Sequence, residues 1–201
     1  ILDRQNPLSM VMGWHSYKKD YEEEWVTVTS EFALTVDGLN SLPNTSFLRN
    51  VPASPGFTFR NRHNVEPGKT YTPEKKVYVA LVQTDGLGLG AWVKPGRGSI
   101  PYAWEVSMNF HWLSPAMLEY FYSRATPNDY FIGCLSGSAY MYPKAFPKKW
   151  LPAEIEKARR FMDTLDLKVF EIMDYSADRT EAGENNLTKE IVDAYYRGMH
   201  E

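Results

Sequence analysis

Three acidic side chains stand where a parallel α/β fold would bring them together. Asp85 and Asp174 each follow an apolar run, and Glu105 lies inside another one, residues 100–107. The carboxyl ends of parallel strands meet at one rim, so residues that end different strands become neighbours. Two carboxyl groups can cleave a glycosidic bond, because one protonates the leaving oxygen while the other attacks the anomeric carbon or activates water. The sequence therefore predicts acid/base catalysis by these three residues.

The surroundings of each acid suggest its role. An apolar strand should raise the pKa of Glu105, which suits a proton donor, and Asp85 would then be the nucleophile or base. The reverse assignment fits nearly as well, and Asp174 is the third candidate. Structural interpretations also exist. Asp85 can close a turn with Gly86, Asp174 can lead into a helix, and a buried Glu105 can pair with a cation such as Arg97.

Residues that could hold a sugar are aromatic, or small and polar, and lie near the ends of predicted strands. Sugars present flat C–H faces that pack on aromatic rings, and aromatic residues make up 14% of the chain. Most of these rings would fill the core in any case. The predicted substrate-binding residues are Trp14, His15, Trp104, Ser136, Tyr140 and Tyr142.

A loop of small residues followed by paired aromatics carries a family resemblance. The heptad from Gly137 to Pro143 resembles the signature of the GxGYxYP family of putative glycoside hydrolases, with Ala139 where the signature has its second glycine. The resemblance implies a barrel-like α/β domain and an oligo- or polysaccharide substrate. It also implies other domains in a longer chain and an extracellular or periplasmic location.

The resemblance extends from Gly13 to the heptad and departs from the family at one strand end. After Asp85 and Gly86 the family tends to continue with Asp and Asn, whereas this chain has Leu87 and Gly88. A role that needs a second acid at this strand end is therefore not expected here.

Predicted strands and helices alternate along the chain. The strands span 8–13, 32–36, 77–83, 100–107, 130–135 and 167–173, and the helices span 17–25, 153–165 and 187–199, with another beginning at Ser114 and Pro115. This order is typical of an α/β fold with a mainly parallel sheet and right-handed crossovers.

The chain length limits how complete such a fold can be. A full TIM-like barrel takes about 250 residues, so 201 residues predict a barrel-like but incomplete arrangement. We expect a single domain over residues 1–201, excised from a longer chain. Residues 38–76, rich in Pro, Gly and Asn, are predicted to form an irregular insertion or lid.

Composition disfavours several classes of partner. The net charge is −3 and basic residues form no stripe, so nucleic acid is not an expected partner. No apolar run approaches the length of a membrane span. The single cysteine, Cys134, excludes an internal disulfide and lies in an apolar run, so a buried, inert thiol is expected.

Neither a metal nor a cofactor is predicted. The four histidines show no i, i+4 spacing of the kind that binds zinc on a helix. Residues 86–91 fit G-x-G-x-x-A, but Pro95 and Gly96 interrupt the helix that would have to bind a pyrophosphate. A serine hydrolase is disfavoured because the residues around Ser136 do not fit G-x-S-x-G.

The main alternative is a non-catalytic carbohydrate-binding or scaffold domain of the same fold. A glycosidase needs two carboxyl groups about 5 to 5.5 Å apart if it retains configuration, or roughly 6.5 to 9.5 Å apart if it inverts. A binding domain needs only aromatic rings and hydrogen-bonding groups. The two hypotheses therefore differ in the geometry of the acids.

Overall fold

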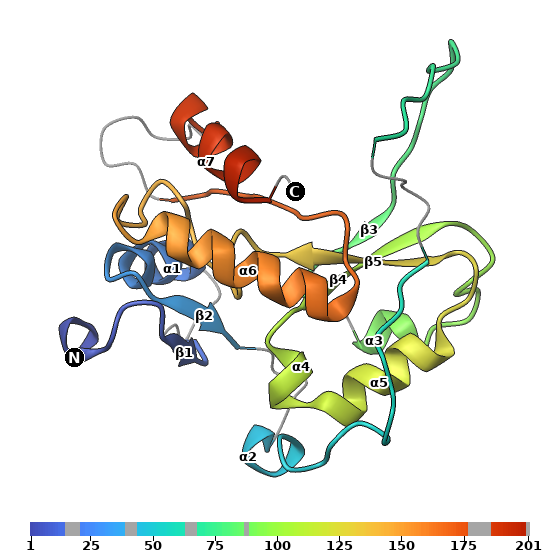
Figure 1. Cartoon of the computed structure of the whole chain (residues 1–201), viewed down its shortest axis with the longest axis horizontal. Helices are drawn as coiled ribbons and strands as arrows, with labels where there is room; N and C mark the ends of the chain where they lie inside the picture. Colours follow the sequence, from blue (N-terminus) through green and yellow to red (C-terminus); the bar gives the residue numbers. More distant parts are fainter. Residues whose placement is uncertain (15–20, 39–43, 63–67, 87–88, 177–185, 200–201) are drawn as a thin grey trace.

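Two parallel sheets form the framework of the chain. Strand β1 (Met10–Met12) pairs with β2 (Thr35–Asp37), and β4 (Tyr102–Ser107) lies between β3 (Val82–Gln83) and β5 (Asp129–Cys134) (Figure 1). The computed structural model describes residues 1–14, 21–38, 44–62, 68–86, 89–176 and 186–199. The predicted α/β class with parallel sheets is confirmed, and the strands of these described residues do not close a barrel.

Helices connect the strands, as the alternating pattern predicts. Helix α5 begins at Pro115 directly after Ser114, and α6 has Pro152 in its first turn. Proline is tolerated there because the first N–H groups of a helix have no partner within the helix. The helices are η1 (Leu2–Arg4), α1 (Glu22–Glu31), α2 (Thr45–Leu48), α3 (Leu89–Trp92), α4 (Phe110–Leu113), α5 (Pro115–Arg124), α6 (Leu151–Leu165) and α7 (Lys189–Met199).

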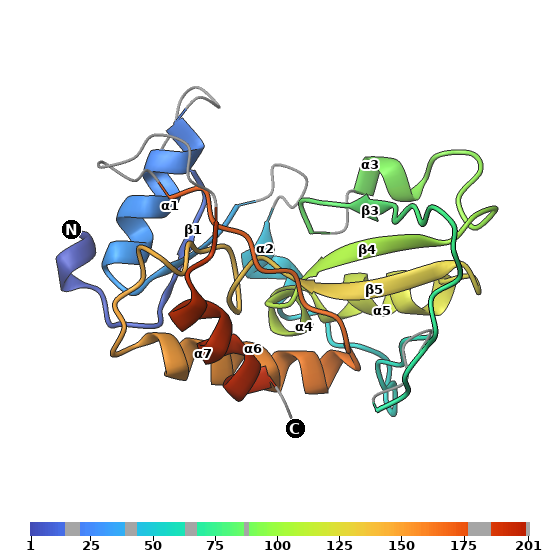
Figure 2. The same cartoon turned by 90° about the horizontal axis from the view of Figure 1, so that it is seen from above.

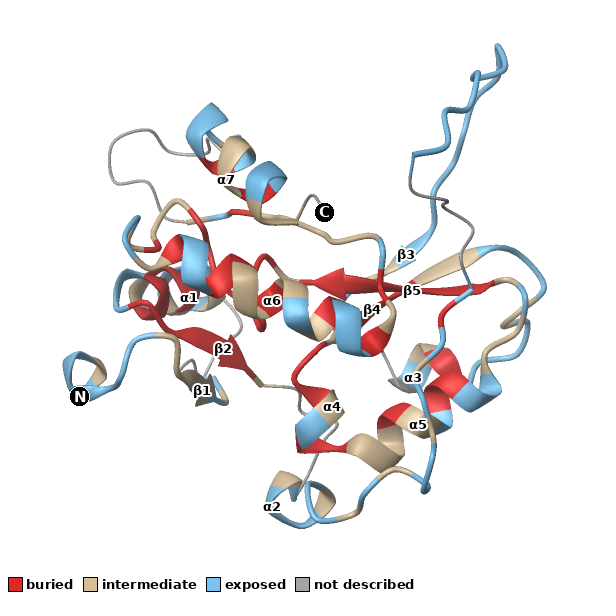
Figure 3. Ribbon diagram, in the orientation of Figure 1, coloured by how far each residue is buried: buried red, intermediate tan, exposed pale blue. Residues whose placement is uncertain are grey.

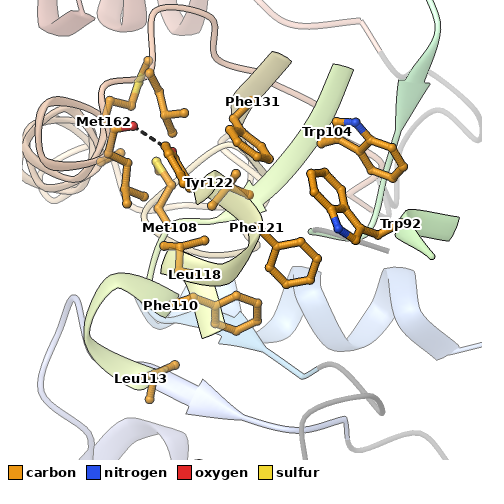
Figure 4. Close-up of a cluster of buried hydrophobic side chains, with 14 residues drawn as sticks. Trp92, Trp104, Met108, Phe110, Leu113, Leu118, Phe121, Tyr122, Phe131 and Met162 are labelled. Atoms are coloured by element: carbon orange, nitrogen blue, oxygen red, sulfur yellow. Dashed lines mark hydrogen bonds between the residues drawn. The ribbon is translucent and has the colours of Figure 1, made fainter. Parts of the chain in front are cut away.

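One face of the larger sheet packs against helices. Side chains alternate along a strand, so Trp104 and Val106 of β4 share a face and meet Phe131 of β5 in the main hydrophobic cluster. Helices α5 and α6 lie on the same side of these strands (Figure 2). Their side chains complete the cluster (Figure 4), in which the Tyr122 hydroxyl donates to the carbonyl of Leu165 at 2.7 Å.

The opposite face of the same strands carries Glu105. In the register of the sheet Glu105 lies beside Ile132, and Ser107 lies beside Cys134. Because these residues alternate with those of the hydrophobic cluster, their side chains point away from α5 and α6. The acid of β4 is therefore separated from the helix-covered core by the sheet itself.

Residues 167–173 lie alongside β5 but form only a partial strand. The Gly133 amide donates to the Val169 carbonyl at 2.9 Å, and the Glu171 amide donates to the Gly133 carbonyl at 2.9 Å. Gly133 and Phe170 form a parallel bridge. The side chain after Phe170 must point to the other face, so Glu171 lies on the same face as Glu105.

The heptad loop joins the two sheets. Tyr140 forms an antiparallel bridge with Val36 of β2 and another with Ser136. The buried Glu154 of α6 accepts a hydrogen bond from the amide of Ser138 at 2.7 Å. Ser136 adopts a positive φ of 71°, whereas Ala139 is not among the positive-φ residues. Alanine in place of the second glycine is therefore accommodated without strain.

The strand predicted over residues 77–83 is wrong for most of its length. Only Val82–Gln83 pairs with β4, and every residue from 68 to 82 is exposed on a segment that extends away from the sheets (Figures 1 and 3). The β-branched composition favours a strand, but an isolated segment has no neighbour to pair with.

Two other predictions fall partly outside the described residues. Helix α1 begins at Glu22, later than predicted, and residues 17–20 are not described. Within the predicted insertion 38–76, residues 39–43 and 63–67 are likewise not described, and the described remainder contains α2.

A buried carboxylate holds the amino-terminal end of β5. Asp129 is ion-paired with Arg97 and accepts from the Trp104 indole at 2.8 Å and from the Thr126 amide at 2.8 Å. These bonds tie the chain before β4 to the start of β5. Trp104 therefore serves the core, with its polar atom satisfied by Asp129.

We expect Asp129→Ala to lower the free energy of unfolding by about 3 kcal/mol, because Arg97 and the Trp104 indole lose their partner. This corresponds to a fall in Tm of roughly 6–12 °C, measurable by calorimetry. The control is Asp163→Ala, which removes an exposed ion pair with Arg159 and should cost about 0.5 kcal/mol or less. Equal losses in the two variants would contradict this account.

Candidate active site

Glu105 and Glu171 form a buried carboxyl pair. Glu105 has 0% exposure, and its carboxyl group lies within hydrogen-bonding reach of Glu171. Burial is the largest cause that raises the pKa of Glu105, to about 9, followed by the hydrogen bond and charge of Glu171. Two carboxylates this close cannot both be charged without strong repulsion, so the pair keeps a proton at neutral pH.

Asp85 lies beside this pair at the end of β3. Its charge raises the pKa of Glu105 further, although Asp85 itself is exposed. The adjoining Gly86 has φ +57°, and a Cβ atom there would lie 2.3 Å from the Ser107 hydroxyl oxygen. Only glycine lets this turn approach the end of β4 so closely. The structure therefore brings Asp85 and Glu105 together, in line with the predicted convergence of strand ends.

Asp37, at the end of β2, adds a further acid. Burial raises its pKa to about 6, while a hydrogen bond with the Asn109 side chain acts in the opposite direction. Burial also raises the pKa of the Cys134 thiol, and the charges of Glu105, Glu171 and Asp37 raise it further. Cys134 thus lies among these three acids as a neutral thiol. We call Asp37, Asp85, Glu105 and Glu171 the acid group.

Sequence analysis missed Glu171 and Asp37, although signals for both were present. Glu171 is an acid inside a predicted strand, which is the criterion that selected Glu105. Asp37 directly follows the strand predicted over residues 32–36, much as Asp85 follows the one predicted over 77–83.

Asp174 is placed elsewhere and has structural partners. Its carboxylate accepts from the Lys144 amide at 2.7 Å and from the Ser176 amide at 2.8 Å, with the Lys144 ammonium 3.8 Å away. It is not among the groups that shift the pKa of Glu105. The structure therefore does not bring Asp174 into the acid group.

The tyrosine pair is buried between β2 and α1. Tyr140 and Tyr142 pack with Val26 and Val36, and their hydroxyl oxygens are 2.9 Å apart. Because Val36 faces Tyr140, the next side chain, Asp37, points to the opposite face of β2. The two tyrosines therefore pack on the face of β2 opposite to Asp37.

Two aromatic rings that pack against the tyrosine pair, those of Trp14 and Tyr175, reach solvent. Trp14 is 37% exposed and packs edge-on against Tyr140, with the ring centroids 6.0 Å apart. Tyr175 is 46% exposed and packs against Tyr142, with the ring centroids 6.5 Å apart. The Trp14 indole donates to the carbonyl of Gly38. Trp14 is thus fixed to Gly38, the residue that follows Asp37 at the end of β2.

The other predicted substrate-binding residues are not available to a ligand or are not described. Trp104 packs in the core on the face opposite Glu105. Ser136 is fully buried, and its hydroxyl donates to the Met173 carbonyl at 2.7 Å. His15 lies outside the described residues.

Searches for a metal site and a membrane span find none in the described part of the chain. No three His, Cys, Asp or Glu side chains there are grouped so that they could hold a metal ion. No described helix is both long enough and apolar enough to cross a bilayer.

Two family models match the chain. The model described as "GxGYxYP putative glycoside hydrolase C-terminal domain" matches residues 75–201, and the model described as "GxGYxYP third domain" matches residues 1–50. Comparison with curated proteins finds no match.

A solved structure shares the fold. It is described as a putative hydrolase from Bacteroides thetaiotaomicron VPI-5482, and it superposes with a TM-score of 0.73 at 20% sequence identity. The match covers 94% of this chain and 36% of the solved chain. The chain thus spans about a third of the length of the protein it resembles.

The raised pKa of Glu105 predicts how stability depends on pH. The folded state keeps this proton up to about pH 9, whereas an unfolded glutamate releases it near its ordinary value of 4.5. The free energy of unfolding should therefore fall as pH rises through this window, by up to about 1.4 kcal/mol per pH unit from this group. Glu105→Gln should flatten the slope, as measured by urea unfolding from pH 5 to 9.

The control is Glu190→Gln, which removes an exposed carboxylate paired with Lys148 and should leave the slope unchanged. If the Glu105→Gln slope matched that of the unmodified protein, Glu105 would have to be ionised in the folded state.

Proposed function

The chain belongs to the GxGYxYP family of putative glycoside hydrolases, and from this membership we propose that it hydrolyses a glycosidic bond in an oligo- or polysaccharide. The observation that carries the proposal is the acid group. Glu105 retains a proton above neutral pH, and the exposed carboxyl of Asp85 lies beside it. A neutral acid next to a solvent-facing carboxylate is the combination that glycosidic cleavage requires.

The roles follow from the two environments. Glu105 supplies the proton for the leaving oxygen, and Asp85 attacks the anomeric carbon or activates water. Glu105 and Glu171 act directly on each other, whereas the catalytic carboxyls of a retaining enzyme stand about 5 Å apart on either side of the bond that is cleaved. They therefore act as one proton-holding unit, and Asp85 is the opposing group.

Trp14 offers a surface for the sugar. Its ring is partly exposed and is anchored through Gly38, the neighbour of Asp37. A sugar stacked on this ring would lie next to the end of β2, which carries Asp37. A barrel-like arrangement of the strands is also part of the proposal, because the strand ends that carry the acid group converge.

The alternative is a carbohydrate-binding or scaffold domain without catalysis. One observation favours it: Glu105 has no exposed surface, so it cannot touch a sugar directly in this conformation. Binding through Trp14 and Tyr175 would require none of the acids.

The test is hydrolysis of a glycan panel by the full-length protein. We expect Asp85→Asn and Glu105→Gln each to lower kcat/KM by about 10²- to 10⁴-fold, the contribution typical of a positioned acid or base. Asp163→Asn, an exposed acid outside the acid group, should retain full activity. Binding of a glycan by calorimetry with no hydrolysis of any substrate would instead establish the binding domain.

A further inference from the structure

Glu105 alone cannot complete the proposed reaction. With 0% exposure, its carboxyl group cannot contact a glycosidic oxygen. Glu171 is partly exposed and lies within hydrogen-bonding reach of Glu105. One of its carboxyl oxygens, Oε2, is buried, but Glu171 is the member of the pair that belongs to a residue reaching the surface.

The surroundings of Glu105 differ from those of the other buried acids. Glu154 has Lys157 at 3.9 Å and accepts from the Ser138 amide, and Asp129 has Arg97. No ion pair to Glu105 occurs among the described residues, and neither of its oxygens accepts a well-formed hydrogen bond there. A buried carboxyl without a cation stays neutral, and here it is turned toward a second carboxyl.

The groups around the pair favour the protonated state. Asp85 and Glu171 act on Glu105 by their negative charge, whereas the nearby Gly86 amide acts weakly the other way. The neutral thiol of Cys134 is near enough to Glu105, Glu171 and Asp37 for their charges to raise its pKa. None of these groups is a cation that would drive the proton off.

The backbone holds Glu171 firmly against β5. Its amide donates to the Gly133 carbonyl at 2.9 Å, and its carbonyl accepts from the Ser136 amide at 3.1 Å. Two residues further on, the Met173 amide donates to the Ser136 hydroxyl at 2.9 Å. The carboxyl of Glu171 is therefore carried on a fixed backbone, as a proton-transfer group requires.

We propose that Glu171 is the catalytic acid that touches the substrate and that Glu105 is a positioning residue that passes its proton to it; this rests on the proposed function. The Glu171 carboxyl gives its proton to the leaving glycosidic oxygen as the bond from that oxygen to the anomeric carbon breaks. Asp85, or water that it deprotonates, forms the new bond to that carbon. The proton that Glu171 gives is the single proton of the pair, passed to it from Glu105, and a proton released by the attacking water or taken from solvent restores the pair.

The experiment compares leaving groups in the full-length protein. An alkyl glycoside needs protonation of its leaving oxygen, whereas a dinitrophenyl glycoside leaves without it. We expect Glu171→Gln to lose about 10²- to 10⁴-fold in kcat/KM on the alkyl glycoside and to stay within a few-fold of the unmodified protein on the dinitrophenyl glycoside. Glu154→Gln, a buried glutamate outside the acid group, should behave like the unmodified protein on both.

The dependence of activity on pH separates the role of Glu171, which gives the proton to the substrate, from that of Glu105, which holds it. In Glu105→Gln the pair has lost its stored proton, so activity on the alkyl glycoside should be lost at neutral pH and recovered at lower pH, where solvent can supply the proton. Glu171→Gln should show no recovery at any pH. Equal activity of Glu171→Gln and the unmodified protein on the alkyl glycoside would overturn the inference while the proposed function stood.

An inactive unmodified protein would overturn the proposed function and the delivery step with it. A readout that does not need activity tests the pair alone. In NMR titrations of glutamate labelled at the carboxyl carbon, the Glu105 signal should titrate at lower pH in Glu171→Gln than in the unmodified protein. An unchanged titration would show that the two carboxyls do not share a proton.

Discussion

The structure depends on a carboxyl group that is buried without a cation. Keeping Glu105 neutral costs far less than burying its charge, but the neutral group still needs a partner for its proton. That partner comes from a different part of the chain, since Glu171 is reached only after the heptad loop and α6. The register of β4 with β5, and of β5 with residues 167–173, is what brings the two carboxyls within reach.

Gly133 of β5 and the heptad that follows the strand fix this arrangement from outside the acid group. A Cβ atom at Gly133 would lie 2.8 Å from the Phe170 ring, so the absence of a side chain at Gly133 lets residues 167–173 approach β5 closely. Beyond β5 the loop turns back to pair Tyr140 with Val36, which ties the end of β2 to the same framework. The tyrosines of the signature are thus explained by packing against β2 and α1.

The sequence was most informative where a pattern reflects local geometry. The helices α5, α6 and α7 and the strands β4 and β5 match their predicted runs closely, because period and proline position set them. Prediction from the sequence failed where the structure of a segment depends on residues far away in the chain. Residues 77–81 lack a neighbouring strand, the heptad tyrosines face α1, and only the register of residues 167–173 shows that Glu171 meets Glu105.

Burial alone does not distinguish a structural acid from a chemical one in this chain. Asp129, Glu154 and Asp174 are as buried as Glu105, yet each accepts from a backbone amide and lies near a lysine or arginine. Such partners offset part of the cost of burying a carboxylate and fix a loop or strand end, although burial still raises the pKa of Glu154. Glu105 has another carboxyl in that place, which stabilises the protonated form instead. The partner of a buried acid, which only the fold reveals, therefore decides whether it holds the structure together or holds a proton.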